Sequence, residues 1–556
     1  MAQYARYRAP AESGQKLIAP PWSELCRIVA GNVAWRRETP LAVLGRPLND
    51  FAVEARAEVL ARAEEYVRSY SPPLKGGGRG GIPDAGIPTK DCSGKGSHQP
   101  PLIVTGHQPE LVHPGVWVKN FAAAALCASK GAVSLNLVID GDACRSTAIR
   151  VPAGTLDEPR WESIEFDGPA EEMPWEERKI LHAEQWQSCP ARVAAATKNL
   201  LSDRMLDAWW PLAMERAAAT GRIGLGLAQA RHLAEIEWGR RNLELPQSEM
   251  CQTAAFRRFT LHLFNELPRF VASYNDALGE YRRVHRLRNH AQPVPNLAVD
   301  GDWFQAPYWV WSTEAPNRRP LYLRKDGAGL VATDRQTFER RLPCVCDDGG
   351  DRALAELATW EAGGLKLRSR ALITTMFARL AVADLFIHGI GGAKYDEVTD
   401  RIIWELFGID PPAFITATAT LRLQVALDND ADDQLRQLKT QRRKLRFHPE
   451  TLLAASNDAS RAAVDEKTRC IAAFRRAASQ PWQRETAREL HDAMSRANAA
   501  FAPWVEAESR LLDAREGRLT EQARAKQMLE SREYAFCLFP REAVVPTLAK
   551  LADGQA

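Results

Sequence analysis

The sequence predicts an α/β protein whose core is a parallel sheet, with largely helical insertions and a long antiparallel helical hairpin near the C-terminus. The core prediction rests on residues 102–139, where a buried strand, a glycine-bearing turn, a helix and a second buried strand follow one another. This order is typical of parallel sheets, which bind ligands at the carboxyl ends of their strands. The hairpin prediction rests on apolar residues that recur at helical spacing among charged ones between residues 431 and 531.

The chain has 556 residues, too many for one hydrophobic core, and its composition divides it into segments. They are an N-terminal helical segment (1–70), a Gly/Pro-rich loop (71–101), an α/β core with a helical insertion (102–425), a coiled-coil helical hairpin (426–533) and a tail that returns to the core (534–556). The loop carries almost nothing that could be buried, so we expect it to be disordered.

Further elements of the core are expected from local pattern. Residues 170–290 are predicted to be mostly helical, and residues 303–346 to form short strands with a hairpin turn at 325–327. A later buried strand ends at His388, and another strand is expected at 414–423.

The helical hairpin shows two apolar stripes. The first arm carries Leu435, Leu438 and Leu445. The second arm carries Leu490, Met494, Ala497, Phe501 and Trp504, which step by four and three as in a coiled-coil seam. The second stripe leaves open a homodimer that forms through the coiled coil.

Composition excludes several classes of protein. The net charge of +3 and a charged fraction of 26% give no reason to expect nucleic acid or an anionic membrane as a partner. No apolar run is long enough to span a bilayer, and the first residues lack the apolar region of a signal peptide. The ten cysteines are scattered, so we expect a cytoplasmic protein without a disulfide framework. Cys344 and Cys346 alone provide too few ligands for structural zinc, so no metal site is predicted.

The first motif, Thr105 to Asn120, lies where the first core strand gives way to a helix. Backbone N–H groups at a helix start, approached closely at Gly106 and Gly115, suit an anion. His107 and His113 could donate to phosphate or transfer protons near neutral pH. The alternative is that both histidines are satisfied structurally within the turn. The segment from His113 to Gly115 is also similar to the His-x-Gly element of nucleotidyl-transfer folds.

The second motif, Leu385 to Asp400, follows the later buried strand. His388 precedes a glycine loop that could wrap a ligand. Lys394 could neutralise a phosphate or carboxylate, and Asp396 could bind an amine or a metal ion. The spacing and the ending differ from those of a Walker A loop. The alternative is a tight structural turn followed by solvated charges.

Two further motifs carry charge. Asp140 and Asp142 end the second core strand, where paired carboxylates could hold an amino group or a divalent ion, although a plain acidic turn fits equally. Residues 281–290 are strongly basic and could cover an acidic substrate or RNA, but a solvated helix face is favoured.

The loop from Gly106 to Lys119, the strand that ends at Asp140, the late hairpin and the returning tail resemble the cysteine-adding enzyme family of bacillithiol biosynthesis. The matching loop positions are Gly106, His107, Gln108, Leu111, Pro114, Gly115, Trp117 and Lys119. The resemblance implies a Rossmann-like core with an attached antiparallel coiled coil. It also implies an enzyme that joins the carboxyl group of cysteine to the amine of a glucosaminyl malate. Two features depart from the family: no histidine follows Asp140, and the glycine loop after His388 is not of the Gly-Gly-Pro type.

The functional prediction is therefore a carbon–nitrogen ligase-like enzyme that joins an amino acid to an amine-bearing metabolite. The predicted catalytic residues are His107, His113, His388 and Asp396. The predicted ligand-binding residues are Gly106, Gln108, Gly115, Lys119, Asp140, Asp142, Gly389, Gly391, Gly392 and Lys394. No cofactor follows from the residues themselves, and a nucleotide, ATP or ADP, is the candidate. The alternatives are a non-catalytic coiled-coil scaffold and a nucleotidyl transferase.

Overall fold

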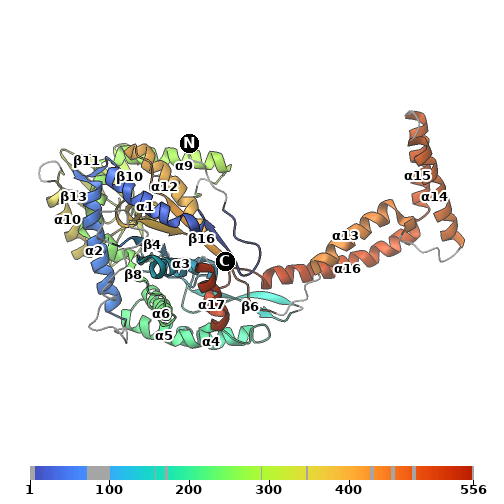
Figure 1. Ribbon diagram of the computed structural model, residues 1–556, viewed down its shortest axis with the longest axis horizontal. Helices are drawn as coiled ribbons and strands as arrows, with labels where there is room; N and C mark the ends of the chain where they lie inside the picture. The colour runs from blue at the N-terminus through green and yellow to red at the C-terminus, as the bar shows by residue number, and fades with distance from the viewer. Residues whose placement is uncertain are drawn as a thin grey trace.

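A six-stranded sheet lies at the centre of the molecule (Figure 1). Its strands, in spatial order, are β1 (Gln15–Ala19), β16 (Phe414–Thr420), β15 (Leu385–His388), β4 (Leu102–His107), β5 (Val133–Val138) and β8 (Leu243–Pro246). All neighbours pair in parallel except β1, which runs antiparallel to β16. The computed structural model describes residues 7–71, 100–156, 158–169, 173–289, 291–345, 349–425, 431–451, 458–478 and 484–553. Most of the loop that we expected to be disordered, residues 72–99, lies outside these ranges.

The order of the strands reverses between β4 and β15. From β4 the chain proceeds outward through β5 to β8, whereas from β15 it proceeds to β16 on the opposite side. In open parallel sheets this reversal leaves a crevice at the carboxyl ends of the two strands, because the helices that follow them lie on opposite faces. Here those ends are His107 and His388.

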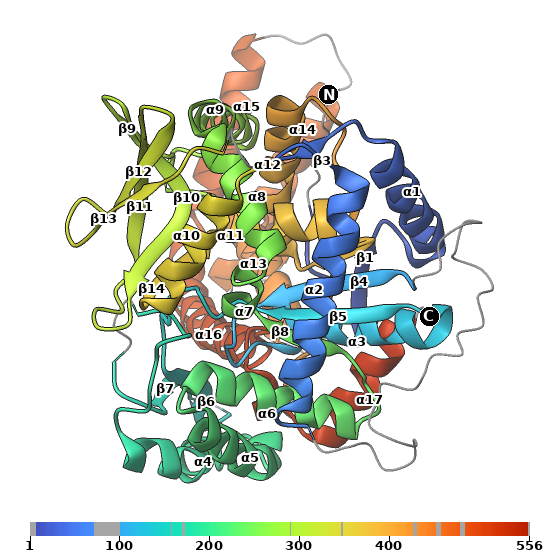
Figure 2. The same cartoon turned by 90° about the vertical axis from the view of Figure 1, so that its left-hand side faces the viewer.

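Helices cover both faces of this sheet, which explains why most residues of its strands are buried. Ile103 packs with α3 (Pro114–Lys130) and α17 (Arg541–Ala552) on one face. Val104, its neighbour, packs on the other face with α2 (Leu48–Arg68), α8 (Ala254–Asn265) and α12 (Ile390–Phe407). Figure 2 shows α2 crossing this second face.

A second, antiparallel sheet stands beside the first (Figure 2). Its strands, in spatial order, are β13 (Glu339–Leu342), β12 (Gly329–Thr333), β11 (Arg319–Asp326), β10 (Trp303–Ser312) and β14 (Leu365–Ser369), with β9 (Val299–Asp300) paired to β10. The predicted turn at 325–327 agrees with the pairing of Asp326 with Gly329.

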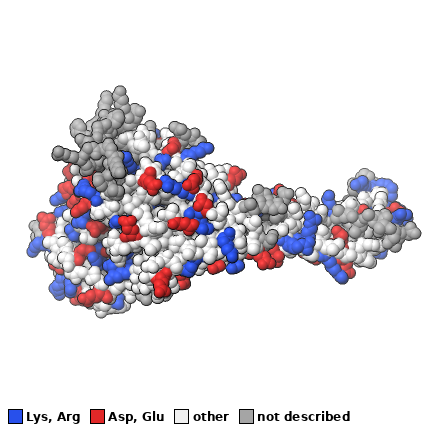
Figure 3. Space-filling model, turned by 90° about the horizontal axis from the view of Figure 1, so that it is seen from below, with Lys and Arg blue, Asp and Glu red and all other residues white. Residues whose placement is uncertain are grey.

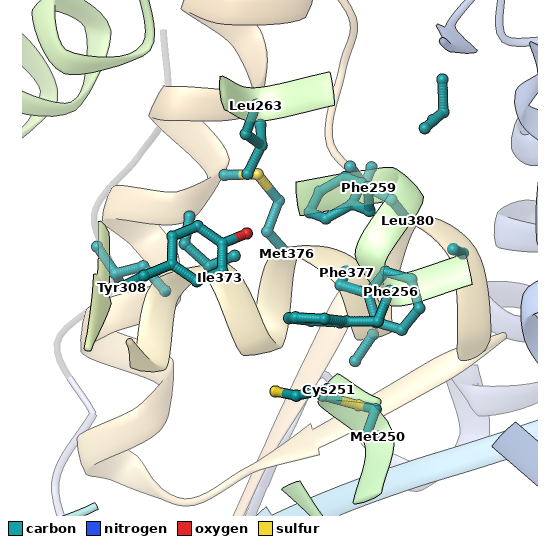
Figure 4. Packing of buried hydrophobic residues seen from close by; sticks show 14 of the residues in the cluster. Met250, Cys251, Phe256, Phe259, Leu263, Tyr308, Ile373, Met376, Phe377 and Leu380 are labelled. Carbon is teal, nitrogen blue, oxygen red and sulfur yellow. The ribbon is translucent and has the colours of Figure 1, made fainter. Parts of the chain in front are cut away.

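One hydrophobic core joins the two sheets. Phe256 and Phe259 of α8 meet Phe377 of α11 (Ala371–Phe377), with ring centroids 5.0 Å and 5.5 Å apart respectively. Tyr308 of β10 and Met376 lie in the same cluster (Figure 4). This packing fixes the antiparallel sheet against the carboxyl edge of the parallel sheet.

Residues 173–289 are mostly helical, as expected. The helices are α4 (Ala183–Thr197), α5 (Met205–Thr220), α6 (Ile223–Glu237), α7 (Gln247–Cys251), α8 and α9 (Leu267–His285). Before them lies a hairpin of β6 (Ala148–Gly154) and β7 (Pro159–Glu165), which the pattern did not indicate. The short strand β8, Leu-Glu-Leu-Pro, was also missed because four residues carry too little periodicity.

A helical projection extends away from the sheets (Figure 1). Its helices are α13 (Ala431–Phe447), α14 (Asp458–Ala478), α15 (Arg484–Ala499) and α16 (Ala502–Leu529). α13 packs on α16, and α14 packs on α15. Leu438 and Leu445 meet Leu512 and Leu519 of α16, so the first arm does not pair with the stripe from Leu490 to Trp504.

After α16 the chain returns to the body. The Phe536 ring packs at a tilt against Trp117 of α3, with ring centroids 4.4 Å apart, and the Phe536 N–H donates to the Val112 carbonyl. This return carries Arg532 and Glu533 past the start of α3.

The charge of the surface is mixed. On the face shown in Figure 3, Lys and Arg are interspersed with Asp and Glu over the body and the projection. In the part of the chain that the structure describes, no helix combines the length and the apolar character needed to cross a bilayer.

Candidate functional site

A cavity of about 520 Å³ opens at the carboxyl ends of β4 and β15, where the strand order reverses. Residues between Gly106 and Lys119 reach it from the end of β4 and the start of α3, and His388 to Gly392 with Tyr395 reach it from the end of β15 and the start of α12. The end of β5 contributes Ile139, Gly141 and Asp142. The antiparallel sheet and its connections contribute Trp309, Arg318, Ser369 and Arg370. Arg532 and Glu533 close the cavity from the C-terminal segment.

Most of the predicted site residues lie around this one cavity. Those that line it are Gly106, His107, Gln108, His113, Gly115, Lys119, Asp142, His388, Gly389, Gly391 and Gly392. Three motifs that are far apart in the chain therefore share a space. Asp140, Lys394 and Asp396 do not line it.

The two aspartates after β5 have different surroundings. Asp140 is buried and turned toward α7, where it accepts hydrogen bonds from Ser248 N (2.9 Å) and Ser248 Oγ (2.5 Å). Burial, aided by the charge of Glu176, raises the pKa of Asp140 to about 7. Asp142 faces the cavity and accepts from Gln108 Nε2 (2.9 Å) and Arg318 Nη1 (2.8 Å). Burial alone would raise the pKa of Asp142, but these two donors hold it below its ordinary value.

The residues of the second motif also lie in different surroundings. Lys394 is exposed on α12, because the helix turns it away from the cavity. Asp396 is buried behind His388, with its Oδ2 only 2.6 Å from His388 Nε2, and it accepts from Thr375 Oγ1 (2.6 Å) and Arg379 Nη1 (2.9 Å). Burial alone would raise the pKa of Asp396, but His388, Arg379 and Thr375 hold it below its ordinary value. Asp396 is thus placed to orient His388 rather than to touch a ligand.

His388 is held on several sides. Its ring stacks on Phe386 and meets Phe414 edge-on, with centroids 4.3 Å and 5.0 Å apart. Burial lowers the pKa of His388, although Asp396 opposes the shift. A Cβ at Gly392 would stand 2.8 Å from His388 Nδ1, so the glycine makes room for this ring.

Lys119 projects from α3 toward the end of β4. Its Nζ donates to the Gly106 carbonyl over 2.7 Å, and no carboxylate among the described residues pairs with it. Burial, reinforced by Arg231, lowers the pKa of Lys119 to about 7. Burial and the nearby Lys119 lower the pKa of His107 to about 3, so this imidazole is neutral at physiological pH.

The contacts of His113 are those of the structural alternative to catalysis. Its Nδ1 accepts from Gly115 N over 3.1 Å and caps the start of α3, and its Nε2 lies 3.6 Å from Glu533 Oε2. Burial is the main reason that the pKa of His113 falls to about 4. Gly115 is required for close approach, since a Cβ there would collide with the Ala419 carbonyl and with Arg532.

The pattern of the sequence did not reveal four residues of the cavity: Trp309, Arg318, Arg370 and Arg532. Each lies outside the glycine-bearing motifs. No local signal marks them, because Trp309, Arg318 and Arg370 belong to the antiparallel sheet and its connections, and Arg532 lies in the returning tail.

The cavity is suited to an anion. α12 begins at its edge, and the first N–H groups of a long helix attract negative charge. A Cβ at Gly391 would meet nothing within 4 Å, so a ligand has open access to this backbone. Lys119, Arg318, Arg370 and Arg532 line the same space, against the acids Asp142 and Glu533.

The basic motif near residue 285 lies elsewhere, at the end of α9. Arg282 donates to the carbonyls of Gln292 (2.8 Å) and Val294 (2.6 Å), so it holds the following loop. Residue 290 lies outside the described residues. Across the described ranges, no cluster of three or more His, Cys, Asp or Glu side chains is arranged to hold a metal ion.

Comparison with known proteins gives no identity. No protein-family model matches the chain. No curated protein is significantly similar to it.

Proposed function

We propose that this chain is a carbon–nitrogen ligase-like enzyme with a Rossmann-like core, and that its substrates meet in the cavity between β4 and β15. The observation that carries the proposal is the meeting of His107, Lys119, Asp142 and His388 with a glycine-rich helix start in one space of about 520 Å³. A compact pocket with a few convergent polar groups is the usual form of an active site. The resemblance of the loop from Gly106 to Lys119 supports the same reaction class, since this loop lines the cavity.

Two groups are suited to proton transfer in amide formation. The attacking amine must lose a proton, and a group with a pKa near neutrality is the most effective acceptor. Lys119, with its pKa of about 7, fulfils that requirement at the base of the cavity. His388, oriented by Asp396 over 2.6 Å, is the second candidate for proton transfer.

Asp142 and Gln108 are suited to hold an ammonium group. Asp142 keeps its negative charge because Gln108 and Arg318 stabilise the carboxylate. A carboxylate of low pKa at the cavity wall would attract the protonated amine of an amino acid before reaction.

A nucleotide, ATP or ADP, fits the residues at the start of α12. Its phosphates would lie against the backbone of Gly389, Gly391 and Gly392, within reach of Lys119 and Arg532. When bound, ATP would supply the energy to activate a carboxyl group for attack by an amine.

The helical projection supports a second candidate function, a scaffold that acts through an antiparallel coiled coil. Leu511 and Phe447 are 66% and 53% exposed on it, which is unusual for residues of their size. Light scattering at several concentrations tests this candidate, and a strict monomer would contradict a dimer. The nucleotidyl-transferase alternative has less support, since both ring nitrogens of His113 already face partners.

The proposal is tested by mass spectrometry of reactions that contain ATP, single amino acids and amine-bearing sugars. We expect a condensation product, with the loss of one water, from the wild type and from Lys394→Met, whose side chain lies outside the cavity. Lys119→Met and His388→Gln should reduce its formation by a factor of at least about a hundred, as typical for a lost acid–base group. The proposal fails if Lys119→Met and His388→Gln form as much product as the wild type, or if no mixture yields a product or stabilises the protein against heat.

A further inference from the structure

Arg370 is a partly buried cation without a counter-ion. Its Nε and Nη2 are shielded from solvent and have no hydrogen-bond partner among the described residues. No carboxylate of the described chain forms an ion pair with it, whereas each of the other two cavity arginines has one. Burial lowers the pKa of Arg370 to about 10. A charged group whose nitrogens are shielded from water and left unpaired is costly, so Arg370 lacks an anionic partner of its own.

The surroundings of Arg370 are fixed. Its guanidinium lies 3.9 Å from the ring centroid of Trp309, and that of Arg318 lies 4.8 Å from the same centroid. Trp309 is on β10, and Arg370 follows β14, the strand paired with β10. Arg318 is anchored to Asp142 over 2.8 Å, yet its buried Nε also has no partner. All three side chains line the cavity.

From this geometry we propose that Arg370 and Arg318, stacked on Trp309, form an oxyanion subsite that binds a carboxylate or phosphate group of the substrate. The subsite rests on the proposed function, since it lies in the same cavity. It differs from the start of α12 because it belongs to the antiparallel sheet. A planar guanidinium with free Nε and Nη groups binds either oxyanion in a bidentate manner.

Titration calorimetry of the full chain tests the subsite without any assay of turnover. The probes are inorganic phosphate and succinate at constant ionic strength, which distinguish a phosphate from a carboxylate preference. We expect at least one of them to bind the wild type, and Arg370→Met to weaken it about ten- to a hundredfold, as the loss of charge-assisted hydrogen bonds would. The unliganded variant should melt at a higher temperature than the wild type, which a purely structural arginine would not allow.

Arg324→Met provides the matched control. Arg324 lies over Trp303 on the same sheet, with the ring centroid 5.0 Å away, but it faces Asp302 (3.7 Å) and lies outside the cavity. The Arg324→Met variant should bind phosphate and succinate as tightly as the wild type does. Equal affinity of Arg370→Met and the wild type, a loss in Arg324→Met as large as in Arg370→Met, or no binding of either probe to the wild type overturns the subsite. If Gly391→Ala weakens binding and Arg370→Met does not, the subsite fails while the proposed active cavity stands. If neither Gly391→Ala nor Arg370→Met weakens binding, the subsite and the proposed active cavity both fail.

Discussion

The two ends of β15 use charge in opposite ways. At the amino end, Asp384 accepts from Arg36 (2.7 Å), from Arg56 (2.8 Å) and from Leu102 N (2.8 Å). At the carboxyl end, Lys119 and Arg370 line a cavity and pair with no carboxylate among the described residues. In the first arrangement the carboxylate is paired with both guanidinium groups, and the three side chains join α1 (Leu25–Glu38), α2 and the sheet. In the second arrangement these two cations have no carboxylate partner, which is the arrangement expected if the carboxyl end of β15 receives an anionic ligand.

The largest expected effect on stability is that of replacing Asp384, at the amino end of β15. Asp384→Asn leaves two buried arginines without their shared carboxylate, so the free energy of unfolding should fall by about 3–5 kcal/mol. Asp142→Asn, at the cavity end, should cost less than about 1 kcal/mol, since its partner Arg318 reaches the cavity. Urea denaturation of both variants measures the difference. Equal losses of unfolding free energy in the two variants would show that the two ends of β15 do not differ in this way.

Gly115→Ala should have the next largest effect on stability. Its new methyl group would collide with the Ala419 carbonyl and Arg532, and overpacking of this kind costs about 1–3 kcal/mol. Gly279→Ala is the control, because a Cβ there meets nothing within 4 Å and alanine favours the helix. Thermal melting compares the two. A Gly115→Ala variant as stable as the wild type would show that α3 does not approach β16 this closely.

The pH dependence of stability tests the burial of Lys119. Its pKa is about 7 in the folded chain against 10.5 when unperturbed, so between these values the unfolded chain binds more protons. Stability should therefore rise with pH across this window by about 1 kcal/mol per unit more in the wild type than in Lys119→Met. Urea midpoints at pH 7, 8 and 9 measure this difference, in which contributions from other groups cancel. If the stability of the wild type and of Lys119→Met changed equally with pH, Lys119 would lie in solvent.

The smallest effect on stability is expected for Gly391→Ala. The new methyl group meets no protein atom within 4 Å, so the free energy of unfolding should change by less than about 0.5 kcal/mol. It would occupy the space against the start of α12, however, so affinity for ATP or ADP should fall about tenfold or more. Calorimetry and thermal melting together separate the two effects. Unchanged nucleotide affinity would mean that the phosphates do not lie against this helix.

The parts of the site predicted from sequence are those carried by local pattern. Apolar runs that end in glycine-bearing turns located His107 and His388, since strand ends are local features. Asp140 and Asp142 could not be told apart, because Ser248, which lies 108 residues away in the chain, binds one of them. Lys394 was misplaced since its orientation depends on where α12 begins. Arg370 and Arg532 reach the cavity through the antiparallel sheet and the returning tail, whose docking no local pattern encodes.

The most direct measurement is anomalous scattering from crystals grown with selenate, a tetrahedral oxyanion. Binding in the cavity should give a peak within hydrogen-bond distance of Arg370 or of the first N–H groups of α12. Peaks confined to surface arginines, such as those at the end of α9, with none in the cavity, would contradict the account.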